Sequence, residues 1–71
     1  GTREYALPES REVTLQVYDV LGRRVATLEQ GRKKAGRHTA RLETGRLSSG
    51  VYFGRLEAGE QTRTQKITVV R

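Results

Sequence analysis

The chain has no cysteine, and this absence excludes both a disulfide framework and a metal site built on thiolate ligands. Its single histidine, His38, has no cysteine or cluster of acidic residues near it in the sequence with which to hold a metal ion. One aspartate, Asp19, and no asparagine are too few for the clustered oxygen ligands of a calcium loop. We therefore predict no metal site and no cofactor.

The groups that catalysis needs are equally sparse. The three serines, Ser10, Ser48 and Ser49, lie in turn signals, and nothing suggests that they converge with His38 and Asp19 as a triad. The glutamates are scattered along predicted strands, with no pair that stands out as general acid and base. Because no helix is predicted, there is also no glycine-rich phosphate loop leading into one. We predict that this domain is not an enzyme and has no catalytic residues.

Long apolar runs are missing as well. No window approaches the roughly 18 apolar residues that a membrane-spanning helix needs. No basic-then-apolar leader opens the chain, which begins with Gly1-Thr2 and not with Met. We expect residues 1–71 to be one domain of a longer parent protein, with a few of its first residues upstream. The lack of cysteine fits the cytosol and also bacterial surface proteins without disulfides.

Positive charge is abundant. Lysine and arginine number 14 against 8 acidic residues, which gives a net charge of +6. Arginine dominates, and its guanidinium suits bidentate binding of carboxylate, phosphate or sulfate. The basic surface therefore indicates either an anionic partner or a solvated face that keeps the domain soluble. The most basic stretch, residues 32–34 with Arg37 and His38, is predicted on a loop and at a strand start.

Aromatic residues argue against nucleic acid as that partner. Small basic β-barrels bind single strands by stacking bases on exposed aromatic side chains. This chain has only Tyr5, Tyr18, Tyr52 and Phe53, and we expect Tyr52 in the core with Phe53 covered beside it. We expect no nucleic-acid binding.

Glycines separate short runs rich in valine, leucine, tyrosine and threonine, a spacing typical of an all-β sandwich or barrel. The predicted strands span residues 3–7, 12–18, 23–29, 36–43, 50–57 and 61–70. Residues 51–53 are apolar on both faces, which favours a central position for that strand. Elsewhere one face is apolar. The residues expected to share inward faces are Val13, Leu15 and Val17, then His38, Ala40 and Leu42, and finally Ile67 and Val69.

The stretch Tyr-Asp-Val-Leu-Gly-Arg-Arg-Val predicts a hairpin between the second and third strands. Asp19 at the first position of a type I turn bonds the backbone N–H groups of the turn. Gly22 at the last position supplies the positive φ that closes a bulged hairpin. Asp19 is therefore interpreted as a turn residue and not as a catalytic carboxylate. The same logic predicts a tight hairpin at Gly59-Glu60.

Several motifs in a fixed order carry a family resemblance. The pattern V-x-L-x-V-Y-D-x-x-G-R-x-V covers residues 13–25, and L-x-S-G-V-Y-F-x-R-L covers residues 47–56. Ala35-Gly36 and His38-Thr39 stand between them, and a threonine-rich strand with a basic-apolar tail closes the chain. From Tyr5 onward the chain resembles the immunoglobulin-like C-terminal sorting domain of type IX secretion cargo. The Pro-Asn-Pro stretch that this family usually has upstream is absent. The immunoglobulin-like domain of flagellar hook-capping proteins shares parts of the hairpin motif and is a more distant alternative.

The resemblance implies an all-β fold, an immunoglobulin-like antiparallel β-sandwich of six to seven short strands. It also implies a C-terminal signal that directs a secreted enzyme or adhesin through the type IX translocon, across the outer membrane, to the cell surface or the extracellular space. The implied partners are the translocon and its sortase-type peptidase, the N-terminal cargo domain, and anionic lipopolysaccharide through the cargo. The runner-up function is an accessory carbohydrate-binding module of a secreted glycoside hydrolase.

We expect the translocon to read the hairpin and the final strand, because an exposed strand edge can accept a partner strand. The same open edge makes a strand-exchanged homodimer conceivable. The candidate recognition residues are Tyr18, Asp19, Gly22, Arg23, Val25, Gly50, Tyr52, Lys66, Ile67, Val69, Val70 and Arg71.

Overall fold

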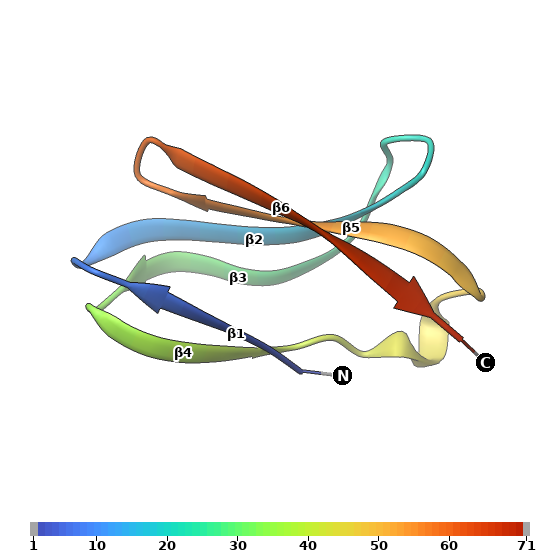
Figure 1. Ribbon diagram of the computed structural model, residues 1–71, viewed down its shortest axis with the longest axis horizontal. Helices are drawn as coiled ribbons and strands as arrows, with labels where there is room; N and C mark the ends of the chain where they lie inside the picture. Colours follow the sequence, from blue (N-terminus) through green and yellow to red (C-terminus); the bar gives the residue numbers. More distant parts are fainter. Residues whose placement is uncertain (1, 71) are drawn as a thin grey trace.

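The computed structural model describes residues 2–70, except for the side chain of Thr44, and is built almost entirely of β-strands (Figure 1). The elements in chain order are β1 (Thr2–Leu7), β2 (Arg11–Asp19), β3 (Arg24–Lys33), β4 (Gly36–Arg41), the 3-10 helix η1 (Thr44–Arg46), β5 (Gly50–Ala58) and β6 (Gln61–Val69). Two antiparallel sheets result: β1 pairs with β4, and the other strands form a sheet of order β3-β2-β5-β6. The predicted all-β class is confirmed, and the two sheets are consistent with a β-sandwich.

The third strand differs most from its prediction. It was expected to end at residue 29, yet β3 continues through Gly31 to Lys33. Gly31 pairs with Val13 and has a φ of 135°, a conformation that glycine adopts readily. Arg32 and Lys33 are thus strand residues and not loop residues, because the extended pairing with β2 outweighs the turn signal of the glycine. β4 is shorter than expected, ending at Arg41, and η1 lies in the connection that follows.

The central position predicted for β5 is confirmed. It lies between β2 and β6, and its register places Tyr18 opposite Phe53 and Phe53 opposite Lys66. A two-residue loop joins β5 to β6, and Gly59 there has a φ of 60°. A positive φ at the first loop position is what a type II′ hairpin turn requires. This loop fixes the register of the last strand.

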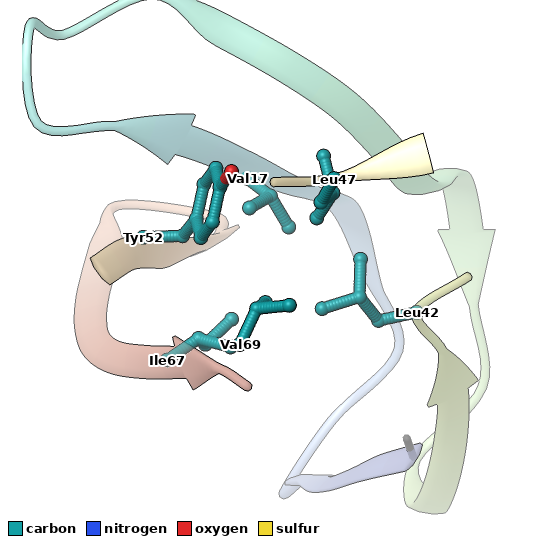
Figure 2. Close-up of a cluster of buried hydrophobic side chains, with 6 residues drawn as sticks. All are labelled: Val17, Leu42, Leu47, Tyr52, Ile67 and Val69. Atoms are coloured by element: carbon teal, nitrogen blue, oxygen red, sulfur yellow. The ribbon is translucent and has the colours of Figure 1, made fainter. Parts of the chain in front are cut away.

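The largest core cluster closes one end of the sandwich. Its buried side chains are Val17, Leu42, Leu47, Tyr52, Ile67 and Val69. Figure 2 shows Leu42 and Leu47, which lie between β4 and β5, facing the side chains from β2, β5 and β6. The hydroxyl of Tyr52 donates to the carbonyl of Ser48 at 2.8 Å, which ties this connection to β5. Burial of each aliphatic side chain contributes about 1.5–3 kcal/mol to stability. We call this region the closed end.

The other end is open on one side. A groove of about 1080 Å³ runs between β1 and the strands β5 and β6, with Leu15 and Leu28 among its lining residues. In Figure 1, β1 and β6 diverge and leave β2 and β3 visible between them. All six side chains of residues 61–66, the first part of β6, are exposed. The two sheets therefore cover each other over only part of their length.

Candidate recognition surface

The β2–β3 hairpin is organised by Asp19. One carboxylate oxygen, Oδ1, accepts hydrogen bonds from the backbone N–H groups of Leu21 and Arg23, both at 2.9 Å. The other, Oδ2, accepts one from Nε of Arg23 at 2.8 Å. The N–H of Gly22 donates to the carbonyl of Asp19 at 3.0 Å, and Gly22 has a φ of 82°. The roles predicted for Asp19 and Gly22 as turn residues agree with this geometry.

These hydrogen bonds also set the acidity of Asp19. The pKa of its carboxyl lies below the ordinary value of 3.8, chiefly because the backbone N–H of Arg23 donates to the charged form. Partial burial works in the opposite direction, while the guanidinium of Arg23 and the N–H of Leu21 lower the pKa further. The hairpin thus keeps Asp19 ionised as a structural acceptor. Every oxygen of the carboxylate is engaged within the turn itself.

A row of side chains crosses the outer face of the four-stranded sheet. The register pairs Arg24 with Tyr18, Tyr18 with Phe53, and Phe53 with Lys66, so one row contains residues from all four strands. Tyr18 and Phe53 are half-buried, whereas Arg24 and Lys66 are exposed. Among residues 2–70, neither of these two cations makes an ion pair. We call this set the outer row.

The tip of the hairpin adds a shallow hollow beside the outer row. Its volume is about 350 Å³, and it is lined by Tyr18, Asp19, Val20, Gly22, Phe53, Arg55 and Thr64. Val20 and Leu21 at the tip are largely exposed, at 67% and 74%. The hydroxyl of Tyr18 donates to Oε1 of Gln16 at 2.8 Å, which holds the phenol ring along the sheet. The surface therefore combines two half-buried aromatic side chains, exposed aliphatic side chains and cations.

The structure divides the predicted recognition residues by location. Tyr18, Asp19, Gly22 and Lys66 lie on the outer row or around the hollow. Tyr52, Ile67 and Val69 are buried in the closed end, so their side chains are inaccessible to a partner. The exposed predicted residues outside this surface are Arg23, Val25, Gly50 and Val70. Arg71 lies outside the described residues.

The members of this surface that were not named as candidates from the sequence are Val20, Arg24, Phe53, Arg55 and Thr64. Val20 and Arg24 nevertheless lie within the hairpin that was expected to be recognised. Phe53 was expected to be covered beside the core, yet it is only half-buried on the outer face. Because successive side chains of a strand point to opposite faces, an inward-facing Tyr52 implies an outward-facing Phe53. What the sequence does not contain is the register that puts Phe53 between Tyr18 and Lys66.

No feature of the described residues suggests metal chemistry or a membrane span. Residues 2–70 contain no group of three or more His, Cys, Asp or Glu side chains that could hold a metal ion. In the same part of the chain, no helix has the length and apolar character needed to cross a membrane. The single histidine stacks on Tyr5, with ring centroids 5.3 Å apart, and its Nε2 donates to the carbonyl of Lys34 at 2.7 Å.

Taken together, the two sheets form a small all-β domain, consistent with a β-sandwich, whose outer face is cationic and partly aromatic. Comparison with known protein families matches residues 4–70 to the secretion system C-terminal sorting domain. The chain therefore belongs to the family of C-terminal sorting domains of type IX secretion. Comparisons with curated proteins and with solved structures give no significant match.

Membership in this family has direct functional consequences. Its domains are sorting signals and are not themselves catalytic. A protein that carries one is secreted, and the domain interacts with the type IX secretion machinery. The resemblance inferred from the ordered motifs of the sequence is confirmed by this match.

Proposed function

We propose that this chain directs a cargo enzyme or adhesin through the type IX translocon, and that the translocon reads the outer row and the neighbouring hairpin tip. The observation that carries the proposal is the row itself. It brings the hairpin residues Arg24 and Tyr18 into line with Lys66 of the last strand, although these segments are far apart in sequence. Tyr and Arg, both present in this row, are enriched among the residues that dominate binding at protein interfaces.

The later steps of export belong to the same proposal. A sortase-type peptidase removes the domain by cleavage upstream of it and attaches the cargo to anionic lipopolysaccharide at the cell surface. These steps are supported by the family resemblance, and they need no chemistry from the domain. A strand-exchanged homodimer stays a prediction, supported by the fact that β1 and β6 each pair with a single strand.

The test is secretion of a folded reporter fused upstream of this chain, in a bacterium with a type IX system. We expect the intact fusion to reach the medium or the cell surface. The double variant Arg24→Glu/Lys66→Glu should retain the reporter inside the cell, because it reverses both cations of the outer row. Lys34→Glu/Arg37→Glu is the matched control, since it changes the charge equally at exposed positions elsewhere.

Surface substitutions test recognition by the translocon more specifically than deletion of the last strand does. Deletion of residues 66–71 would also remove Ile67 and Val69 from the core and unfold the domain. Equal secretion of the Arg24/Lys66 variant and the control would refute recognition through the outer row. Retention of the intact fusion would refute the sorting function, and salt-sensitive binding of the chain to a cell-wall polysaccharide would then favour the carbohydrate-binding alternative.

A further inference from the structure

The groove between β1 and β6 is largely separate from the surface assigned to the proposed function, and the residue that lines both is Thr64. Its lining includes apolar side chains from β2, β3, β5 and β6, namely Leu15, Val17, Leu28, Leu56 and Ile67. Both flanking strands are sheet edges, because β1 pairs only with β4 and β6 only with β5. Each edge presents backbone N–H and C=O groups that can pair with another extended chain.

The exposure of β6 shows that this side of the sandwich is incompletely covered. Alternate residues of β6 point toward the inner face, where Ile67 and Val69 are buried. Gln61, Arg63 and Gln65 share that direction but are exposed. Leu56, the cross-strand partner of Arg63, is only half-buried. One more extended segment beside β6 would cover these positions.

The charges of the groove indicate what such a segment carries. Arg3 on β1 and Arg63 on β6 both line the groove, and each sits at an inward position of its strand. Among residues 2–70 neither guanidinium has a carboxylate partner, whereas Arg11 is held by Glu9 at 2.9 Å. Two acidic residues, Glu4 and Glu60, also line the groove, but Glu4 alternates with the inward positions of β1 and Glu60 lies in the turn. An unpaired guanidinium can form charge-assisted hydrogen bonds with a carboxylate, and the apolar side chains beside it can pack against apolar residues of the same strand.

We propose that the groove binds an extended segment of the secretion receptor, added as a strand along the free edge of β6. This proposal rests on the proposed function, because the receptor supplies the segment. For a strand antiparallel to β6, as all paired neighbours in this sheet are, its inward residues from N- to C-terminus are two apolar residues, opposite Ile67 and Gln65, and then one carboxylate opposite Arg63. Inward residues of a strand occur at every second position, so the expected pattern is apolar-x-apolar-x-acidic. Backbone pairing gives affinity, and the inward side chains give specificity.

The test uses the full chain and two synthetic peptides. The first, Thr-Val-Thr-Val-Thr-Glu-Thr, carries the expected pattern, and the second has Lys in place of Glu. We expect the Glu peptide to bind and to shift backbone amide NMR signals of β1 and β6. Arg3→Gln/Arg63→Gln should weaken this binding about tenfold or more, the effect of losing a charge-assisted hydrogen bond. Lys34→Gln/Arg37→Gln should bind the Glu peptide like the unmodified chain.

A variant with reversed charges distinguishes a change in peptide specificity from a loss of binding caused by unfolding. Arg3→Glu/Arg63→Glu should prefer the Lys peptide, a result that an unfolded chain cannot give. Equal binding of both peptides, binding of neither, or shifts confined to β3 and β4 would overturn the proposal. A concentration-dependent dimer that covers the groove and excludes the Glu peptide would also overturn it.

Secretion of the cargo fusion distinguishes this proposal from the proposed function. If the intact fusion is secreted and Arg3→Glu/Arg63→Glu is secreted equally well, the groove proposal fails while the sorting function stands. If the intact fusion is retained, the sorting function fails, and with it the receptor as the source of the segment. Reduced secretion of the Arg3/Arg63 variant, beside normal secretion of Lys34→Glu/Arg37→Glu, would support the groove proposal.

Discussion

The two halves of β6 differ sharply although they belong to one strand with one partner. Residues 61–66 are exposed on both faces, whereas Ile67 and Val69 are each only 5% exposed. Both halves pair with β5 in continuous register from Gly50 to Ala58. The difference lies across the sandwich, where Leu42 and Leu47 cover the second half and the groove adjoins the first.

This contrast teaches that strand pairing alone does not bury a strand. Hydrogen bonding to β5 organises all of β6, but stability comes from the apolar area that the second layer covers. In a domain of this size, which buries only about 60% of its unfolded surface, such cover is scarce. The closed end should therefore determine folding, and the exposed side chains that line the groove should tolerate substitution with little loss of stability.

The largest loss of stability is expected for a substitution in the closed end, and it tests the difference between the two parts of β6 directly. Ile67→Ala should lower the free energy of unfolding by about 2–4 kcal/mol, because it leaves a cavity in the closed end. Gln65→Ala, two residues earlier on the same face, should change it by no more than about 0.5 kcal/mol. Urea unfolding followed by circular dichroism measures both values. Similar losses for the two variants would break the distinction between the halves.

A smaller loss of stability is expected for a substitution in the β2–β3 hairpin, which extends the closed end. Gly22→Ala should cost about 1 kcal/mol, because alanine is strained at a φ of 82°. A Cβ at this position would meet no atom within 4 Å, so the cost comes from the backbone alone. Gly45→Ala is the matched control, since its Cβ also has open space and its φ is not positive. Equal thermal stability of the two variants would contradict this account.

The pH dependence of the hairpin follows from Asp19. Its pKa is lower in the folded chain than the ordinary 3.8, so ionisation favours the folded state. This contribution is complete above the unfolded pKa and is lost as the pH falls through the folded pKa. Asp19→Asn should therefore flatten stability between neutral and acidic pH, as measured by urea unfolding at a series of pH values. An unchanged pH profile would show that the carboxylate makes no net contribution.

The smallest effect on stability is expected for Tyr5, which lines the groove. The hydroxyl of Tyr5 is buried, has no hydrogen-bond partner among the described residues, and its pKa is raised chiefly by that burial. Tyr5→Phe removes a polar group whose burial is uncompensated, so stability should be equal or up to about 1 kcal/mol higher. Thermal unfolding measures the change. A clear loss of stability would mean that the hydroxyl has a partner in solution.

Much of the fold could be predicted because local signals were strong. Alternation predicted the inward faces of β2, β4 and β6, and the Asp19–Gly22 turn followed from residue type alone. β3 was predicted too short because Gly31 resembles a turn residue, whereas the structure pairs Gly31 and the residues on either side of it with β2. Pairing between distant segments leaves no local pattern in the sequence.

The interaction surfaces depend on that distant pairing. Tyr18 and Lys66 were identified as candidates, but Phe53 between them was missed. The residues of β5 alone do not determine its register with β2 and β6. Ile67 and Val69 were candidates on account of their regular pattern, and that pattern reflects burial. The groove was not predicted at all, because it results from how far one sheet extends over the other.

The cations of β6 have a further consequence for the behaviour of the domain at high concentration. The run Ile-Thr-Val-Val, which consists of the last three residues of β6 and Val70, has the β-branched, uncharged composition of segments that stack into fibrils. Arg63 and Lys66 precede it on a strand with a free edge, and charges at such positions are expected to oppose stacking by repulsion between copies. A polyanion that neutralised both would remove this protection, so storage with heparin-like additives should promote aggregation of the domain.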